Sequence, residues 1–536
     1  MKINKYISFL SLAALLTACD LDKFPEGDTV LESQKNEVSI DSPEKIAADI
    51  NSLKAILTPA FAFSNNQHTD FGVPSIALIA DCSGQDMVSE AHGYNWFQRS
   101  LLFRDRLSTS FSSQFIWKTH YSHIKAANDL LKTMYASYPE DKRVDDAANY
   151  IGQALANRAY DYLELIQYFQ FTYLGHEDAL GLPLVLETTT QEQATNNPRV
   201  SVKEVYDLIM KDLNQAVKYL EEYPIPRSDK GQITAGVAYG LRARANLLMG
   251  KYAEAAEDAK QALTLSGARP YTFDEVSAPS FNKDADSWLW GIIITLEDDV
   301  VQTGIVNWPS HLCSLTGNGY TTGVGVNVVY KRINSLLYDK MNQTDVRRSW
   351  WVDQNLQSPA LTKAYPEVAS IIGKELNYLP YTNVKFGPEN NELLNATNAQ
   401  DWPLMRAEEM YLIMAEGLAR SQGVAAGKAV LEDLLKSSRD PEYICKATSL
   451  DDFIDEVWVQ RRIELWGEGF SLQDILRLKK PIVRQGANFS PNTTFEDLKP
   501  ESPIFIFNIP EAETSVNKGI TLDQINEVAT PPIPMN

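Results

Sequence analysis

Cysteine and histidine are scarce in this chain of 536 residues, which contains four cysteines and six histidines. No CxxC pair occurs, and this excludes a zinc ribbon or a redox dithiol. Apart from Cys19, the cysteines are Cys82, Cys313 and Cys445, so at most one disulfide can form among them. We expect these three thiols to be small buried hydrophobic groups instead.

Recognised catalytic motifs are missing as well. The sequence has no GxSxG, no HExxH and no Walker loop, which are the local patterns of common hydrolases, metalloproteases and nucleotide-binding enzymes. We therefore predict that the chain is not an enzyme and that it carries no cofactor and no catalytic or metal site.

Basic residues are the minority: 49 Lys and Arg stand against 70 Asp and Glu, for a formal net charge of −21. A field of that sign repels phosphate backbones, which excludes nucleic acid as a partner. Neutral ligands such as glycans or peptides are not affected by this argument.

Long apolar runs are absent beyond the N-terminus, where Lys2 and Lys5 precede an apolar stretch over 7–16. This pattern is typical of an export signal and is too short for a stable membrane-spanning helix. The residues Leu16-Thr17-Ala18-Cys19 resemble a lipobox. That resemblance implies a signal peptide over 1–18, lipidation of Cys19 and attachment to a membrane surface by acyl chains, with a flexible polar tether over 19–40.

Helical periodicity dominates the remainder, which predicts a mostly α fold. Apolar residues at spacings of three and four predict helices over 115–135, 147–171, 205–220, 234–249, 253–265, 402–420, 425–437 and 450–478. Ser201 followed by Glu204 predicts an N-cap with a capping box. Short strands are expected over 289–296, 384–386 and 505–509.

One helical hairpin resembles a tetratricopeptide unit. The residues that carry this resemblance are Gly250, Tyr252, Ala255, Ala256, Ala259 and Pro270. Such repeats bury their faces only by stacking, so further hairpins are expected over 115–171 and 201–265. We predict an N-terminal region with helical hairpins over 41–270, a loop-rich insertion over 271–400 and a C-terminal helical region over 401–536, all in one body.

The C-terminal helices carry a second resemblance. They contain Arg406-Ala407-Glu408-Glu409-Met410-Tyr411-Leu412 and Arg461-Arg462-Ile463-Glu464-Leu465, followed by Glu468-Gly469-Phe470. Together with Arg158-Ala159-Tyr160, Gly181-Leu182-Pro183 and the lipobox, these residues resemble the SusD/RagB family over nearly the whole chain.

This resemblance implies a lipid-anchored protein of the outer membrane that faces the cell exterior. Such a protein captures a glycan, or less often a peptide, and passes it to a SusC-like β-barrel transporter driven by TonB, without cleaving it. Two other classes stay open, a carbohydrate-active enzyme and a structural surface protein. A glycosidase needs two suitably spaced carboxyl groups, and 70 acidic residues supply such pairs trivially.

Sugar binding favours a flat aromatic face flanked by polar groups that bond to hydroxyls. The first candidates are Tyr94, Asn95 and Trp96, in a stretch that contributes to the ligand face in relatives. The remaining candidates lie in the loop-rich insertion, namely Trp308, His311, Asn318 and Tyr320, followed by Trp350 and Trp351. An adjacent Trp pair usually buries at least one ring.

The arginines and glutamates of the C-terminal helices have a different predicted role. We expect Arg406, Glu409, Arg461, Arg462 and Glu464 to form partly buried ion pairs between packed helices, since the planar guanidinium group suits interhelical carboxylates. No nucleophile accompanies them, so they are predicted to belong to the scaffold.

Overall fold

The computed structural model of the chain describes residues 43–91, 93–140, 145–322 and 328–535. The predicted signal peptide, Cys19 and the tether over 19–40 lie outside these ranges. The chain divides into two units, Met1–Ile46 and Ala47–Asn536. Of the first unit, the structure describes only the start of α3 (Pro43–Ile56), and all other elements belong to the second.

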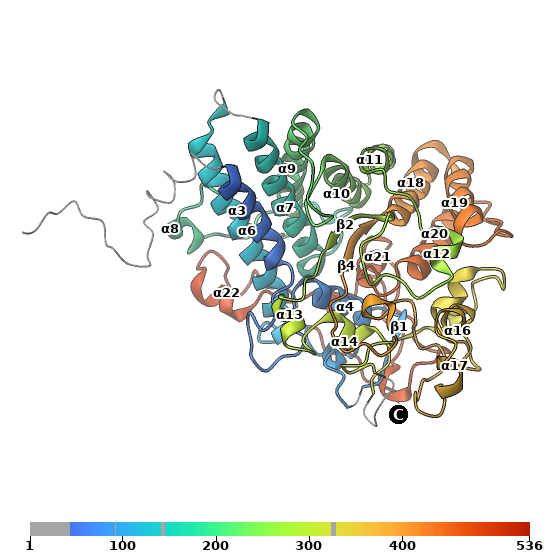
Figure 1. The fold of residues 1–536 in the computed structure, drawn as a ribbon. Helices are drawn as coiled ribbons and strands as arrows, with labels where there is room; N and C mark the ends of the chain where they lie inside the picture. Colours follow the sequence, from blue (N-terminus) through green and yellow to red (C-terminus); the bar gives the residue numbers. More distant parts are fainter. Residues whose placement is uncertain (1–42, 92, 141–144, 323–327, 536) are drawn as a thin grey trace, which may run out of the picture. The chain divides into compact units, whose positions relative to one another are not determined.

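Seven long helices form a consecutive array in the second unit. They are α6 (Phe111–Ser137), α7 (Asp145–Phe169), α9 (Val202–Glu222), α10 (Ala235–Leu248), α11 (Tyr252–Ser266), α18 (Ala407–Gln422) and α19 (Val424–Ser438). Each helix contacts the next in this order, as Figure 1 shows. The chain leaves the array after α11 and returns to it at α18, so the predicted loop-rich insertion begins and ends at neighbouring helices. The mostly α class is confirmed, while the tetratricopeptide assignment and the boundaries at 270 and 400 stay predictions.

Local sequence signals explain how α9 begins and why it is buried on one side. The Ser201 side chain accepts a hydrogen bond from the Glu204 backbone N–H, and the Glu204 carboxylate accepts one from the Ser201 backbone N–H. The predicted capping box is therefore confirmed. Val205, Ile209 and Leu213 recur along one face and are buried, as expected for an amphipathic helix that packs on one side.

Small residues allow the array to pack closely where α11 meets α18. Ala255, Ala256 and Ala259 of α11 are all buried. A methyl group added at Gly417 of α18 would lie 2.5 Å from the carbonyl oxygen of Tyr252. Only glycine allows the two backbones to approach each other this closely.

Two small antiparallel sheets supply the β structure that the ribbon of Figure 1 shows among the helices. Strand β1 (Met87–Val88) pairs with β3 (Arg332–Ile333), and β2 (Trp288–Ile292) pairs with β4 (Trp402–Arg406). The predicted strand at 289–296 is thus confirmed over its first half. The helix expected from Trp402 was wrong in its first turn, because 402–406 form a fully buried strand and α18 begins only at Ala407.

Three further expectations were wrong. Residues 450–478 form two helices, α20 (Leu450–Glu464) and α21 (Ser471–Arg477), separated by a turn in which Gly467 and Gly469 have φ angles of 82° and 92°. The expected strand at 505–509 is an irregular segment after the 3-10 helix η5 (Pro503–Phe505); its Phe507 N–H donates to the Tyr168 carbonyl oxygen. Residues 384–386 make only an isolated bridge.

The remaining elements are short, apart from the 11-residue helix α4. They are α4 (Val73–Ser83), α5 (Gln98–Leu101), α8 (Gln191–Ala194), α12 (Phe273–Val276), α13 (Asp299–Gln302), α14 (Trp308–Leu312), α15 (Ser335–Tyr338), η2 (Val346–Trp350), α16 (Pro359–Ala364), α17 (Val368–Ile371), η3 (Glu389–Asn391), η4 (Pro491–Thr493) and α22 (Glu511–Val516).

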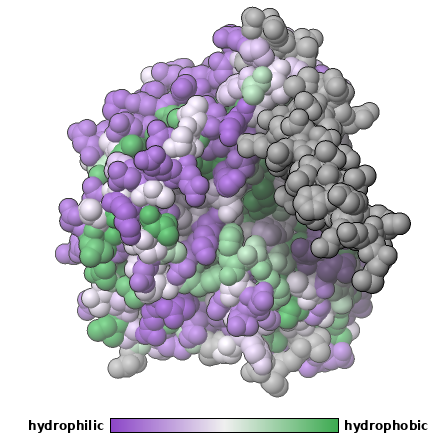
Figure 2. Space-filling model, turned by 90° about the vertical axis from the view of Figure 1, so that its left-hand side faces the viewer, coloured by the Kyte–Doolittle hydropathy of each residue, from purple (hydrophilic) through white to green (hydrophobic). Residues whose placement is uncertain are grey.

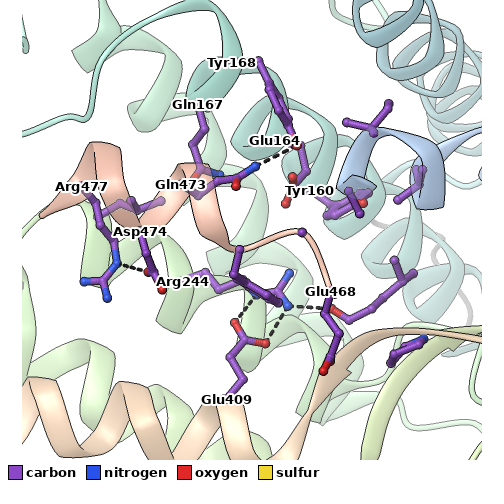
Figure 3. Close-up of a pocket in the computed structure, with 18 of the residues that line it drawn as sticks. Tyr160, Glu164, Gln167, Tyr168, Arg244, Glu409, Glu468, Gln473, Asp474 and Arg477 are labelled. Carbon is purple, nitrogen blue, oxygen red and sulfur yellow. Dashed lines mark hydrogen bonds and ion pairs between the residues drawn. The ribbon is translucent and has the colours of Figure 1, made fainter. Parts of the chain in front are cut away.

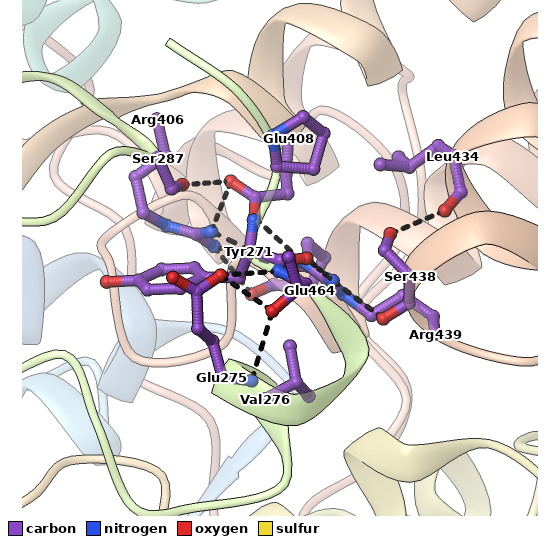
Figure 4. A network of polar contacts seen from close by, with 12 residues as sticks. Tyr271, Glu275, Val276, Ser287, Arg406, Glu408, Leu434, Ser438, Arg439 and Glu464 are labelled. Atoms are coloured by element: carbon purple, nitrogen blue, oxygen red, sulfur yellow. Dashed lines mark hydrogen bonds and ion pairs between the residues drawn. The ribbon is translucent and has the colours of Figure 1, made fainter.

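A buried network of ion pairs joins the insertion to the C-terminal helices (Figure 4). Arg439 donates to both Glu408 and Glu464, and Arg406 pairs with Glu408, Glu464 and Glu468. The other three residues that were predicted to form ion pairs also do so. Glu409 pairs with Arg244, Arg461 pairs with Asp474, and Arg462 pairs with Asp86. The predicted ion pairs of these charged residues are therefore confirmed, and their scaffold role stays a prediction.

The surface reflects the acidic, polar composition. Hydrophilic side chains predominate over the described residues on the face shown in Figure 2, with hydrophobic ones scattered between them. Within the described ranges, every helix is too short or too polar to cross a bilayer. The three cysteines Cys82, Cys313 and Cys445 are buried free thiols, as expected.

Candidate ligand-binding site

Three of the predicted aromatic residues come together at the surface. The ring centroids of Tyr94 and Tyr320 lie 6.0 Å apart and those of Trp96 and Tyr320 lie 6.4 Å apart. Tyr94 is 57% exposed, and Trp96 and Tyr320 are partly exposed. Residues more than 220 positions apart in the sequence thus share one patch, which combines the first candidate segment with the loop-rich insertion.

His68 completes this patch and was missed from the sequence. Its ring stacks on Trp96 with centroids 4.5 Å apart and planes 12° apart, and its Nδ1 is hydrogen-bonded to the Tyr320 hydroxyl. The histidine therefore ties the two rings to each other. We call His68, Tyr94, Trp96 and Tyr320 the aromatic site.

Two other predicted residues lie beneath the aromatic site and support it. The buried Asn95 accepts a hydrogen bond from the Phe97 backbone N–H and donates to the Glu90 carbonyl oxygen, which fixes the turn that presents Tyr94 and Trp96. His311 is buried and stacks on Tyr320 with centroids 4.7 Å apart. Its Nε2 lies 3.0 Å from the His68 carbonyl oxygen.

The loop that carries Tyr320 is held tightly against α14. The Tyr320 N–H donates to the Ser310 carbonyl oxygen at 2.7 Å. Gly319 has a φ angle of 139°, and a methyl group added there would lie 2.4 Å from the Ser310 Cα. The predicted Asn318 is partly buried and donates to the Gly304 carbonyl oxygen. The tyrosine ring is thus positioned by a constrained backbone.

The three remaining tryptophan candidates lie in the interior. Trp308 is buried and its indole N–H donates to the Gln400 carbonyl oxygen. Trp350 and Trp351 are 1% and 0% exposed, and the Trp350 indole N–H donates to the Val276 carbonyl oxygen. Both members of the adjacent pair are therefore core residues, and we leave these three rings out of the candidate site.

Burial disfavours the charged forms of His68 and Tyr320 in the aromatic site and of His311 beneath it. It lowers the pKa of His68, and it lowers the pKa of His311 well below the usual value, with the nearby Lys331 charge acting in the same direction. Burial also raises the pKa of Tyr320. An aromatic surface at which charge is disfavoured suits a neutral ligand.

A partly open cavity of about 80 Å³ lies between α4, α7, α10, α18 and α21 (Figure 3). Its lining includes four carboxylates, those of Glu164, Glu409, Glu468 and Asp474. This volume is well below the ~300 Å³ at which typical small-molecule sites begin. The cavity is therefore too small to enclose a sugar.

The carboxylates of this cavity are mostly engaged by cations. Glu409 lies 2.7 Å from Arg244, Glu468 lies 2.8 Å from Arg406, and Asp474 lies 2.7 Å from Arg461. In the described part of the chain, Glu164 is the one member of the four without a hydrogen-bond or ion-pair partner. Burial raises the pKa of Glu164. The cavity thus lacks the two available carboxyl groups that glycoside hydrolysis requires.

Histidines next to the cavity are also engaged. His120 and His123 of α6 both lie against the Asp161 carboxylate of α7, with Nδ1 to oxygen distances of 2.9 and 2.8 Å. Across the ranges that the structure describes, no group of three or more His, Cys, Asp or Glu side chains is arranged to hold a metal ion.

Family models match two long segments of the chain. A model described as "Starch-binding associating with outer membrane" matches residues 29–247, and the SusD family model matches residues 281–527. No significant match was found among curated proteins.

Solved structures share the fold over nearly their full length. A SusD-like carbohydrate binding protein from Bacteroides vulgatus is 23% identical with a TM-score of 0.74, covering 91% of this chain and 99% of its own. Another SusD superfamily protein from that organism is 20% identical with a TM-score of 0.70, covering 91% and 99%. Surface glycan-binding protein A from Bacteroides thetaiotaomicron, in complex with laminarihexaose, is 17% identical with a TM-score of 0.60, covering 89% and 98%. With the two family models and this shared fold, the chain belongs to the SusD/RagB family.

Proposed function

We propose that this protein binds a glycan at the aromatic site without cleaving it and delivers it to a TonB-dependent transporter of the outer membrane. The observation that carries the proposal is the convergence of Tyr94, Trp96 and Tyr320 on one exposed patch. Folding has brought rings from two distant loops to the surface, where burial in the core would be the usual outcome for aromatic residues.

The chemistry of the patch fits a neutral saccharide. Exposed ring faces stack on the apolar C–H side of a pyranose, and the Tyr94 hydroxyl provides a polar group at the same surface. Asn65 and Asn66, three and two residues before His68 in the sequence, are exposed, and their amides are suited to bond sugar hydroxyls. Because His68 joins Trp96 to Tyr320, the rings are preorganised, which reduces the entropy lost on binding.

Binding without cleavage is supported by the state of the acidic groups. The carboxylates that line the cavity between α4, α7, α10, α18 and α21 are paired with arginines or lysine, except Glu164, and the cavity is too small to enclose a sugar. Charged groups used in this way stabilise the scaffold and do not supply a general acid and a nucleophile.

Cell-surface location and transport are supported by the family. One matching model carries the description "associating with outer membrane", and the lipobox at Cys19 supplies an anchor. The related surface glycan-binding protein A was solved with laminarihexaose. A glycan ligand, a lipid anchor facing the exterior and a SusC-like β-barrel partner together make the function that we propose.

A glycan array followed by isothermal titration calorimetry tests ligand binding. We expect Trp96→Ala and Tyr94→Ala each to weaken binding of the array hit by about 1 to 3 kcal/mol, the range for an aromatic hot spot, which is ~5- to 150-fold in Kd. Tyr94→Ala is the cleaner variant because the ring is largely exposed, and we expect its loss to leave the fold unchanged. Trp458→Ala, which removes a partly exposed tryptophan of α20, is the matched control and should bind like the unmodified protein.

Unchanged affinity in both site variants would refute the aromatic site, and hydrolysis of any array member would refute a purely binding role. Transport is tested separately by mild detergent extraction of the native membrane. Co-purification of a large β-barrel protein is expected, and extraction of this chain alone under conditions that preserve other membrane complexes would count against the partner.

A further inference from the structure

A second pocket lies in the loop-rich insertion, apart from the aromatic site. It has a volume of about 510 Å³ and is lined by residues of α12, η2 and α16 and the loops between them. None of the four aromatic-site residues contributes to it. The volume falls within the ~300 to 1,000 Å³ of typical small-molecule sites.

The walls of this pocket are fixed by hydrogen bonds to the scaffold. Thr344 donates to the Asp440 carboxylate at 2.6 Å, which pins one wall to the loop after α19. Ser358 donates to the Ser349 carbonyl oxygen at 2.6 Å and also caps α16. Behind the pocket, Arg347 belongs to the buried ion-pair network. The pocket is therefore formed before any ligand arrives.

Its lining is balanced in charge, unlike the strongly acidic chain, with two basic and two acidic side chains. Arg348 and Lys363 both line the pocket, and no described carboxylate lies within ion-pair distance of either. Of the two acids in the lining, Asp345 is paired with Arg347 at 2.7 Å. Asp353 accepts hydrogen bonds from two backbone N–H groups. Two cations thus face one partly satisfied carboxylate, in a protein whose net charge is −21.

Aromatic and amide groups complete the lining. Phe273 is 39% exposed and offers an apolar face. The Arg348 guanidinium lies over the Tyr338 ring, 4.2 Å from its centroid, and its Nη1 donates to the Met341 carbonyl oxygen at 3.0 Å. These contacts hold the cation in place. Gln343 is exposed at the rim and is free to bond hydroxyls.

We propose that this pocket binds a sugar acid, with its carboxylate on Arg348 and Lys363 and its C–H face on Phe273. A guanidinium group and an ammonium group that lack carboxylate partners favour an anionic ligand through charge-assisted hydrogen bonds. The exposed ring and the Gln343 amide favour a polyhydroxylated one. The inference rests on the proposed function only for the choice of a saccharide, and it adds an acidic sugar unit to the ligands that the protein takes.

Calorimetric titration of the detergent-solubilised protein with D-glucuronate tests whether the pocket binds a sugar acid. D-glucose is the control that has the sugar ring without the charge, and acetate is the control that has the carboxylate without the sugar. We expect glucuronate to bind at least about tenfold more tightly than either control, and binding to weaken as NaCl is raised. The double variant Arg348→Gln, Lys363→Gln should weaken glucuronate binding by tenfold or more. Lys363→Gln alone, at an exposed position, keeps the test valid if the double variant unfolds. Lys374→Gln, an exposed lysine outside the pocket, is the charge-matched control.

Glucuronate affinity that survives loss of both cations, or that equals the affinity for glucose or acetate, would overturn the inference. Tyr94→Ala separates this result from the proposed function, because it should leave glucuronate binding unchanged while weakening the array hit. Loss of glucuronate binding in Tyr94→Ala would place the acid at the aromatic site and also overturn the second site.

Discussion

Replacing Glu464 with glutamine is the most direct test of the buried ion-pair network. The Glu464 carboxylate accepts hydrogen bonds from Arg439 Nε and Nη2, each at 2.9 Å, and lies 3.3 Å from Arg347 and Arg406. The network contains four cations and four carboxylates, namely Arg347, Lys385, Arg406 and Arg439 with Asp345, Glu408, Glu464 and Glu468. Glu464→Gln leaves one buried positive charge uncompensated.

The expected loss of stability follows from this charge balance. Breaking a buried ion pair by removing one partner costs about 3 to 5 kcal/mol. The side chains of Glu464, Arg406 and Arg439 are each at most 1% exposed. The free energy of unfolding is measured by urea denaturation followed by tryptophan fluorescence. Asp207→Asn, which breaks the exposed pair with Lys203, is the control and should cost less than about 1 kcal/mol.

The pH dependence provides an independent check. Burial acts to raise the pKa of Glu464, but Arg439, Arg406 and Arg347 outweigh it and hold the pKa well below the usual value. The stabilisation is therefore complete above the unfolded pKa of about 4.3 and is lost as the pH falls toward the folded pKa. The difference in the free energy of unfolding between the unmodified protein and Glu464→Gln should therefore narrow below about pH 4. A Glu464→Gln cost equal to that of Asp207→Asn at pH 7 would refute the reasoning.

Three other outcomes are expected. Gly417→Ala should destabilise the protein by about 1 to 3 kcal/mol in urea denaturation, because the new methyl group meets the Tyr252 carbonyl oxygen at 2.5 Å; a stabilised variant would contradict the close approach of α11 and α18. Burial raises the pKa of Asp81 to about 7. The contribution of the protonated Asp81 carboxyl to the stability of the fold is therefore largest below pH 4 and is lost as the pH rises through 7. The melting temperature of Asp81→Asn relative to the unmodified protein should therefore increase from pH 4 to pH 8, and a constant difference would argue against the raised pKa. Cys19→Ser should abolish labelling by radioactive palmitate and release the protein from membranes, whereas labelling that persists would exclude this cysteine as the anchor.

The sequence predicted the helical array well because its signals are local. The stripe of apolar residues and the Ser201 cap determine α9 without reference to the rest of the chain. The failures occurred where local signals are ambiguous. The apolar run at Trp402 suits a helix or a strand equally, and only pairing with β2, more than 100 residues away, decides between them. The single helix expected over 450–478 failed for another reason, because Gly467 and Gly469 are a local signal for a break that the prediction did not use.

The candidate site was predicted in part for a similar reason. Loop aromatics are good candidates for a ligand surface, but residue type alone does not separate Trp96, which reaches the surface, from Trp308, which fills the core. His68 had no signal of its own, since its role depends on stacking against Trp96 and bonding to Tyr320. The partners of the predicted arginines and glutamates, such as Arg439 and Asp86, come from distant segments and appear only in the folded chain.

The insertion departs from α11 and rejoins at α18, two helices that touch each other. Its end points are thus fixed by the array, whatever lies between them. The entropic cost of closing a segment between two fixed ends rises only slowly with the length of the segment, so the insertion can be lengthened or exchanged at little cost. Relatives with the same array can therefore carry very different ligand surfaces on it, and recognition can diversify while the supporting helices stay constant.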